Sequence, residues 1–229
     1  MKSINYLVDL FYPRLCQACG RSLLEYEHVI CSYCKVQLPK ANIHNLVNNP
    51  IEQVFWGRVS ISAAAAYYQY IKGGKVQQLI HQMKYKGFQE IGVFVGETFG
   101  RQLNESTRFS KVDFIIPVPL HISKLRKRGF NQSELFARGL AKTMEANVLD
   151  DNLYRKVAST TQTKKNRWER YKNVNDIFGI RDASLFENKK LLLVDDVITT
   201  GSTIEGCASI LNQIEGVEVS VAAMASAAF

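Results

Sequence analysis

Residues 191–203, LLLVDDVITTGST, join two acids to a string of hydroxyls at the end of an apolar run. Asp195 and Asp196 are adjacent, and paired carboxylates accept hydrogen bonds from sugar hydroxyls or hold Mg²⁺ through water. The TTGST segment at 199–203 lies between a predicted strand and a predicted helix. Its backbone amides and hydroxyls could surround a phosphate at the start of that helix. The two halves together fit a phosphorylated ribose with a metal nearby.

Other sites built on similar residues fit less well. The loop has no lysine, and the Walker pattern is absent, which disfavours a nucleoside triphosphatase. Response-regulator receivers also place paired aspartates after a strand, but there most of the fold follows them. Only 33 residues of the 229 follow Asp196 here, too few for a doubly wound sheet. The alternative to a binding site is an ordinary strand whose following loop is polar and binds nothing.

Four of the five cysteines form two Cys-x-x-Cys pairs separated by residues 20–30: Cys16, Cys19, Cys31 and Cys34. Two such turns can present four thiolates to one tetrahedral zinc ion, and four sulfurs leave no open position, so the zinc is structural. Disulfides are the alternative, but nothing indicates an oxidising compartment. A redox motif is disfavoured because the pairs lie outside any βαβ pattern. Cys207 is expected to be a buried small residue.

The composition suits one sizeable core with a small appendage: 46% of the residues are hydrophobic. The formal charge of +8 favours phosphate-bearing partners, with simple solubility as the alternative. No secretory signal is visible, and no apolar run reaches the roughly 18 residues needed to cross a bilayer. We therefore expect a soluble cytoplasmic protein without membrane insertion.

Strand and helix patterns alternate after the cysteines, which predicts a parallel sheet with helices on both faces. In such a sheet ligands bind beyond the carboxyl ends of the strands, which points to 117–132 and 195–203. We expect an N-terminal helix and zinc ribbon over 1–50 and the larger domain over 51–229. Residues 41–56 are predicted as a linker or irregular wrap. Predicted strands cover 58–70, 113–119, 190–194 and 217–224, and predicted helices cover 75–85, 90–103, 133–144 and 204–214.

Two further segments are rich in basic residues. Residues 115–132 carry Lys124, Arg126, Lys127 and Arg128 before GFNQ and could hold a diphosphate, or form a solvated basic turn. Residues 155–172 have seven basic residues and one acid, and fit either a flap over a ligand or a disordered loop. Trp168 could stack on a base or pin the flap.

The motif LLLVDDVITTGST resembles the phosphoribosyl diphosphate (PRPP) binding motif of type I phosphoribosyltransferases. Nearly the whole chain resembles the ComF family, which joins a four-cysteine zinc ribbon to a phosphoribosyltransferase domain and is associated with natural competence. The resemblance is carried by CQAC, CSYC, MKYKG at 83–87, PVPLH at 117–121, RKRGFNQ at 126–132, TTQTKKNRWERYKNV at 160–174 and VDDVITTGST. It implies a type I phosphoribosyltransferase fold, an α/β fold with a parallel sheet flanked by helices.

The resemblance also implies roles for single residues. Asp195 and Asp196 would hold the ribose and Mg²⁺, and 158–175 would be the flexible loop. The 5-phosphate would bind Thr199, Thr200, Gly201, Ser202 and Thr203. The diphosphate loop would include Pro119, Leu120, His121, Arg126 and Arg128. For nucleic acid we single out Lys164, Lys165, Arg167 and Arg170.

The favoured function is PRPP binding by a ComF-like protein that handles single-stranded DNA during natural competence. The alternative is an active, Mg²⁺-dependent phosphoribosyltransferase that acts on an unidentified base or amine, although no assured general base is visible. A third possibility is a scaffold whose zinc ribbon docks a helicase-like competence protein. The sequence does not identify catalytic residues or the oligomeric state.

Overall fold

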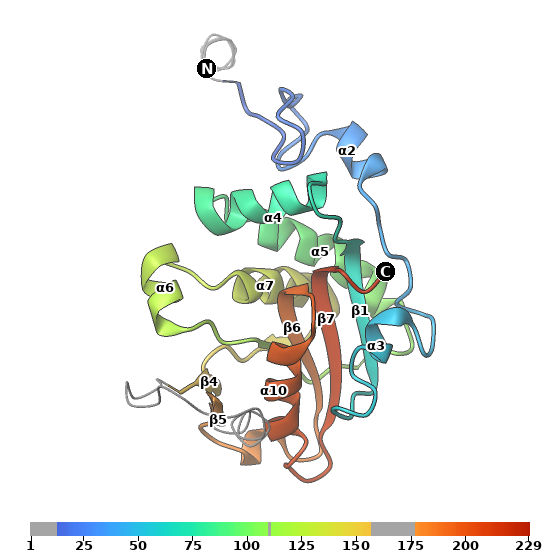
Figure 1. Ribbon diagram of the computed structural model, residues 1–229, viewed down its shortest axis with the longest axis vertical. Helices are drawn as coiled ribbons and strands as arrows, with labels where there is room; N and C mark the ends of the chain where they lie inside the picture. The colour runs from blue at the N-terminus through green and yellow to red at the C-terminus, as the bar shows by residue number, and fades with distance from the viewer. Residues whose placement is uncertain (1–12, 110, 157–176) are drawn as a thin grey trace.

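The computed structural model describes residues 13–109, 111–156 and 177–229, and all statements about structure concern these residues. Its centre is a parallel five-stranded sheet in the order β1-β7-β6-β2-β3 (Figure 1). The strands are β1 (Ala63–Gln69), β2 (Phe114–Pro117), β3 (Asn147–Val148), β6 (Lys190–Ile198) and β7 (Glu218–Ser226).

Helices cover both faces of this sheet, and a small antiparallel hairpin lies beside it (Figure 1). The hairpin pairs β4 (Leu153–Arg155) with β5 (Phe178–Ile180). The helices are α2 (Ser32–Gln37), α3 (Pro50–Gln53), α4 (Lys75–Lys86), α5 (Glu90–Asn104), α6 (Ile122–Arg128), α7 (Gln132–Met144), α10 (Ser202–Leu211) and the 3₁₀ turn η1 (Ser184–Phe186).

Alternate side chains of the central strands enter two separate apolar clusters, one on each face of the sheet. On β6, Leu192 and Val194 join the cluster that contains α4, α5 and α7, whereas Leu191 and Leu193 join the cluster of α3 and α10. A strand buried on both faces must be apolar at every position, because successive side chains point to opposite sides. The predicted parallel α/β sheet is therefore confirmed.

Three differences from the predicted elements bear on the site. Residues 41–56 contain a helical turn, α3, because Asn49 caps its amides and Pro50 suits the first helical position. The basic stretch after β2 is the short helix α6, which ends at Gly129 with φ of 79°. Strand β6 runs on to Ile198, because its pairing with β7 continues to Ser226, so both acids lie within the strand.

Helices α5 and α7 touch backbone to backbone. A Cβ built on Gly96 would lie 2.8 Å from the Cα of Gly139, and one built on Gly139 would lie 2.3 Å from the carbonyl oxygen of Val93. Only glycine permits such an approach. The contact holds α7 against α5, and the first turn of α7 reaches the end of β6. The crossing therefore positions part of the site described below.

No helix among the described residues combines the length and the hydropathy that crossing a bilayer requires. Three predictions lie outside these residues: the short N-terminal helix, the flap at 158–175, and the nucleic-acid contacts of Lys164, Lys165, Arg167 and Arg170.

The α5–α7 contact predicts that Gly139→Ala destabilises the protein by about 3 kcal/mol, because the new methyl group would overlap backbone atoms. In an uncrowded helix the same change would stabilise by about 1 kcal/mol, so the sign of the effect is diagnostic. Urea unfolding of both proteins measures it. Gly87→Ala is the control: its Cβ meets nothing within 4 Å, and its φ of 78° should cost about 1 kcal/mol. A gain in stability for Gly139→Ala would contradict the close contact.

Candidate functional site

A cavity of about 560 Å³ opens at the carboxyl ends of β2 and β6. Helix α4 supplies one wall, α6 and the start of α7 supply another, and the end of β6 forms the floor. This is the place where parallel α/β sheets bind ligands. Its lining residues are Tyr70, Gln77, Ile80, His81, Lys84, Tyr85, Val118, Pro119, Leu120, Lys124, Arg128, Gln132, Ser133, Arg155, Asp195, Asp196, Val197, Thr199 and Thr203.

The acid pair on the floor is held by side chains from two helices. Ser133 Oγ of α7 donates a hydrogen bond to Asp195 Oδ1 at 2.9 Å, and the backbone N–H of Asp196 donates to the same oxygen at 2.8 Å. Lys84 Nζ of α4 lies 2.7 Å from Asp196 Oδ2. Strand β2 ends at Pro117, which pairs with Val194 of β6. The next residues of β6, Asp195 and Asp196, therefore lie beyond the end of β2, at the cavity. The pair is thus a set of oxygen acceptors held in place by Ser133 and Lys84.

Burial raises the pKa of Asp195 to about 7, and the neighbouring charge of Asp196 adds to the rise. The hydrogen bonds from Asp196 N–H and Ser133, with the charge of Lys84, lower the pKa only in part. Protein surrounds this carboxylate, although the residue keeps a partly exposed edge. Two carboxylates at such a place favour an added cation or hydroxyl donors. The residues present therefore fit Mg²⁺ or a diol.

The loop at 199–203 connects the end of β6 to the amino end of α10. Thr199 and Thr203 line the large cavity, and the whole loop lines a smaller one of about 30 Å³. The hydroxyl residues are exposed, whereas Gly201 is buried with φ of 73° and caps α10. Exposed hydroxyls beside the first amides of a ten-residue helix offer donors to an anion. All five residues predicted for the phosphate therefore lie together in this loop.

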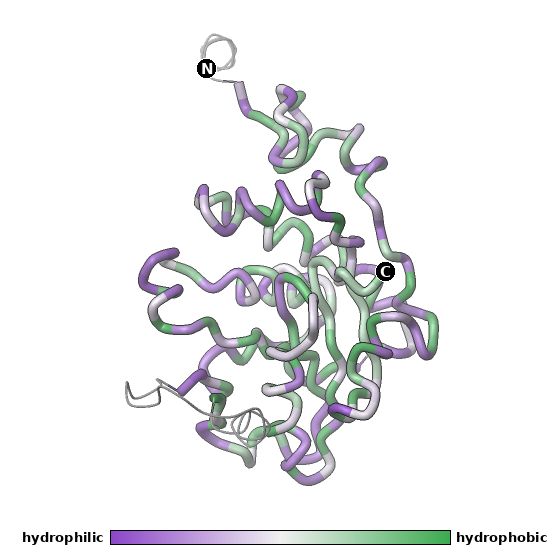
Figure 2. The backbone as a smooth tube through the Cα atoms, viewed as in Figure 1, coloured by the Kyte–Doolittle hydropathy of each residue, from purple (hydrophilic) through white to green (hydrophobic). Residues whose placement is uncertain are grey.

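The residues predicted for the diphosphate loop do not all face the cavity. Pro119, Leu120 and Arg128 line it. His121 accepts a hydrogen bond from the backbone N–H of Ser123 and thereby caps α6, and Arg126 is exposed on α6 away from the lining. Figure 2 shows α6 as largely hydrophilic. The lysine of α6 that lines the cavity is Lys124.

A buried amide stands beside Arg128. The Arg128 guanidinium donates to Gln132 Oε1 at 2.8 Å and lies 5.3 Å from the ring centre of Tyr85. That donation identifies the oxygen end of the amide. Gln132 Nε2 is then a buried donor without a hydrogen-bond partner among the described residues. A donor in this state suits a site whose acceptor arrives with a ligand.

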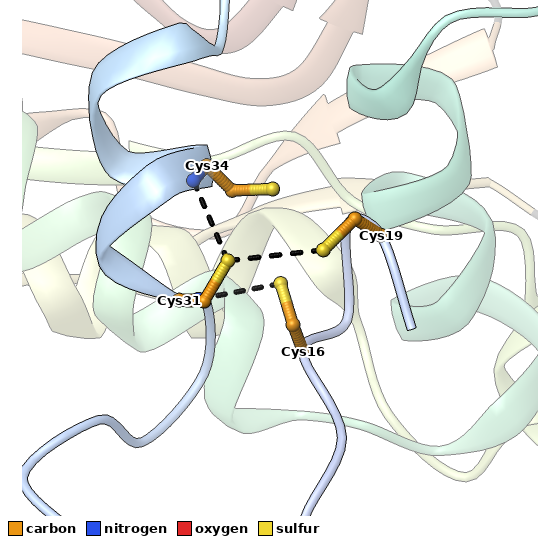
Figure 3. Close-up of side chains that lie close together, drawn as sticks. All are labelled: Cys16, Cys19, Cys31 and Cys34. Atoms are coloured by element: carbon orange, nitrogen blue, oxygen red, sulfur yellow. Dashed lines mark hydrogen bonds between the residues drawn. The ribbon is translucent and has the colours of Figure 1, made fainter. Parts of the chain in front are cut away.

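The four cysteines predicted to bind zinc converge, and their side chains point toward one another (Figure 3). Their four sulfur atoms lie within 4.8 Å of one another, and Cys19 Sγ lies 3.7 Å from Cys31 Sγ. Tetrahedral zinc with bonds of about 2.3 Å needs sulfurs roughly 3.8 Å apart. The amides of Cys31 and Cys34 point at sulfurs, 3.3 Å from Cys16 Sγ and 3.5 Å from Cys31 Sγ. The set could bind a zinc ion.

The segment that carries these cysteines, which we name the four-cysteine unit (residues 16–34), is packed onto the rest of the protein. Cys16, Cys31 and Cys34 belong to the same apolar cluster as α4 and α5. Tyr33 lies 5.1 Å from Lys75 Nζ at the start of α4. A cation over an aromatic face is attracted to it. The unit therefore braces the helix that carries Lys84.

The fifth cysteine lies apart from this unit. Cys207 is buried in α10, as predicted for a small residue of the core. Burial raises the pKa of its thiol well above the usual value, so the side chain stays a neutral part of the core.

Sequence reasoning did not single out Lys84, Ser133 or Gln132 as site residues. Each lies on a helix far along the chain from the acids. A signal was present: Lys84 is in MKYKG, and Gln132 ends RKRGFNQ, two of the motifs on which the family resemblance depends. Motif membership alone, however, does not show that Lys84 and Ser133 contact the acids or that Gln132 lines the same cavity.

Comparisons with known proteins point the same way as the geometry. The family model for the phosphoribosyl transferase domain matches residues 125–228, which contain the loop, the acids and most of α6. The chain is 26% identical over 222 residues to competence protein F of Haemophilus influenzae, covering 93% of this chain and 90% of that protein. It is 25% identical to the DNA utilization protein YhgH of Escherichia coli K12, over 86% of this chain and 83% of that protein.

A third relative is competence protein ComFC of Bacillus subtilis, 25% identical over 86% of this chain and 71% of that protein. Adenine phosphoribosyltransferase from Saccharomyces cerevisiae superposes with a TM-score of 0.40 at 14% identity, over 63% of this chain and 71% of that one. The domain match and the relatives along almost the whole chain agree with the acid pair and loop in the cavity. The chain thus matches the phosphoribosyl transferase domain over residues 125–228, and along most of its length it is similar to proteins named for competence and for DNA utilization.

Proposed function

We propose that this protein binds PRPP with Mg²⁺ and handles single-stranded DNA during DNA uptake. The observation that supports PRPP most directly is that one cavity brings together the acid pair, the loop 199–203 and the cations of α6. These three groups match the diol, the 5-phosphate and the diphosphate of one small molecule. The relatives named for competence and for DNA utilization support the role in DNA uptake.

Each part of the cavity has its own task in this proposal. Asp195 and Asp196 accept hydrogen bonds from the ribose hydroxyls, and the amides of 199–203 donate to the 5-phosphate. Lys124 and Arg128 face the diphosphate as charged donors. The two carboxylates would hold Mg²⁺ through water, and the ion would neutralise part of the diphosphate charge. Lys84, which pairs with Asp196 and lines the same cavity, adds a further positive charge near the diphosphate.

The four-cysteine unit is proposed to hold structural zinc and to offer a docking surface for a helicase-like protein. Exposed apolar side chains in and beside the unit support the second role: Tyr26 is 70% exposed and Val36 is 75% exposed. A cytoplasmic location is proposed as well. All five cysteines are free of disulfides, which supports a reducing compartment.

Basic residues supply the proposed DNA surface. Arg126 and Lys127 are exposed on α6 and do not line the cavity, so they can meet a nucleic acid backbone while the cavity is occupied. Lys164, Lys165, Arg167 and Arg170 remain proposed contacts outside the described residues. Exposed cations bind phosphates without reading sequence, and they release counterions as they do so.

Isothermal titration with PRPP and Mg²⁺ tests the small-molecule site. We expect measurable binding by the wild type and a weakening of at least about tenfold for Asp195→Ala and for Asp196→Ala, because each removes an acceptor for the diol. Asp113→Ala is the matched control, since this aspartate bonds the backbone of Lys190 at the amino end of β6. Absence of heat with the wild type, or wild-type affinity in both site variants, would refute PRPP binding.

Fluorescence anisotropy with a labelled single strand tests the DNA surface. We expect affinity to fall steeply between about 50 and about 200 mM salt. Arg126→Ala/Lys127→Ala should weaken binding and reduce the salt slope by roughly 0.7 for each phosphate that is no longer neutralised, with PRPP affinity unchanged. Arg138→Ala/Lys142→Ala removes the same charge from α7 as a control. An affinity for single-stranded DNA that does not change with salt concentration would contradict binding to the DNA backbone.

Metal analysis and chelation test the four-cysteine unit. We expect one zinc ion per chain, lost in Cys31→Ser and retained in Cys207→Ser, because Cys207 is buried in α10 away from the other four cysteines. Removing zinc with a chelator should lower the thermal unfolding midpoint, since the unit shares its apolar cluster with α4 and α5. A zinc-free protein with an unchanged midpoint would contradict a structural metal.

A further inference from the structure

The phosphate loop at 199–203 is backed by a segment distant in sequence, which we name the bracing segment (residues 49–58). It includes α3 and the turns that follow. A Cβ built on Gly201 would lie 2.8 Å from Phe55 Cε1 and 2.8 Å from Val54 Cγ1. The loop therefore lies directly against the bracing segment, and glycine is needed both for this contact and for its positive φ.

Arg58, at the end of the bracing segment, binds the loop through both ends of its guanidinium group. Its NH1 donates to the carbonyl oxygen of Thr200 at 2.7 Å, and its NH2 lies 3.4 Å from Ser202 Oγ. The same NH2 forms an ion pair with Glu205 in the first turn of α10. NH1 also donates to the carbonyl oxygen of Val54 at 2.9 Å, which anchors the side chain at its own end.

These contacts decide how the loop presents its backbone. The described chain has no cis peptide, and in a trans peptide the C=O and the following N–H point in opposite directions. Because Arg58 holds the Thr200 carbonyl, the Gly201 N–H must point away from the guanidinium. Arg58 lines neither of the two cavities. A carbonyl turned the other way would place negative charge where a phosphate is to bind.

Arg58 also neutralises an acid close to the phosphate position. Glu205 lies in the first turn of α10, whose amino end is the proposed anion site. A free carboxylate there would repel a phosphate dianion. Its side chain is 17% exposed, so solvent screens its charge only in part. The ion pair with Arg58 offsets that repulsion.

The bracing segment is itself fixed before any ligand arrives. Asn49 Oδ1 accepts hydrogen bonds from the amides of Ile51 at 3.0 Å and Glu52 at 3.1 Å, and its Nδ2 donates to the Ala64 carbonyl oxygen at 2.9 Å. Glu52, 6% exposed, pairs with Arg108 at 2.6 Å. A support held in this way loses little conformational freedom when the ligand binds, which favours affinity.

We propose that Arg58 is the positioning residue of the phosphate loop and sets its affinity for the 5-phosphate end of the ligand. The inference builds on the proposed PRPP site and adds Arg58, the first residue of the predicted strand 58–70. Arg58 acts through Thr200 and Glu205 rather than by touching the ligand.

The test uses titration of the full-length protein with ribose 5-phosphate and, separately, with Mg²⁺-diphosphate. We expect Arg58→Ala to weaken ribose 5-phosphate binding about tenfold, because one oriented amide is no longer held and Glu205 is unpaired. Diphosphate affinity should stay within about twofold, since Lys124 and Arg128 are untouched. Arg58→Lys should recover part of the affinity, because it restores the charge but lacks the planar fork.

Arg138→Ala is the control variant. It removes an arginine that pairs with Glu134 on α7 and with Asp150, which follows α7, and it should change the affinity for neither ligand. Unchanged ribose 5-phosphate binding in Arg58→Ala would overturn the inference, as would an equal weakening for both ligands, which indicates general damage to the fold. If the wild type and Arg58→Ala bind diphosphate and PRPP equally well, only the positioning role of Arg58 is refuted and the PRPP site stands. If the wild type binds no ligand, the PRPP site fails and the positioning role with it.

Discussion

The partial burial of two adjacent carboxylates at the end of β6 is the constraint on which the rest of this structure depends. Protein around Asp195 raises its pKa to about 7, and the charge of Asp196 adds to the effect. Such a pair is stable only where other elements supply donors and positive charge. Ser133 comes from α7 and Lys84 from α4, so both helices must be held against the sheet with little freedom. The packing of α4, α5 and α7 against the sheet holds the two helices in place.

Two devices hold that layer. The glycine contact between α5 and α7 lets the helices approach until backbone atoms meet, which leaves α7 no room to slide. The four-cysteine unit packs on α4 from the other side through a shared apolar cluster and the stacking of Lys75 on Tyr33. A metal at the four sulfurs would therefore act on the cavity indirectly, by holding the helix that carries Lys84. The four-cysteine unit therefore has a structural role, support of α4, that is separate from the proposed docking of a partner protein.

The fold was largely predictable because its pattern is strong. Strands such as 190–194 and 217–224 are rich in apolar residues on both faces, which is expected of a sheet buried on both sides, and the intervening helices keep regular spacing. The extension of β6 to Ile198 was missed, because polar residues usually end a strand, whereas pairing with β7 keeps this one extended. The helical turn at Pro50–Gln53 was missed because four residues show no periodicity. Of the predicted site residues, Asp195, Asp196, Thr199 and Thr203 line one cavity, and their proximity was predictable because they are neighbours within one motif.

By itself, the sequence determined the chemistry of the short segments: four thiols at zinc-binding spacing, two acids, a hydroxyl-rich loop and a basic stretch after β2. Tertiary structure alone decided which distant side chains complete them. Lys84 lies 112 positions before Asp196, and Arg58 lies 142 positions before Thr200, yet each pair is joined by a direct contact of 2.7 Å. It also decided that Lys124 faces the cavity while Arg126 does not. The physical reason is that residue type and local spacing specify what a group can do, whereas helix packing and strand pairing specify what it can reach.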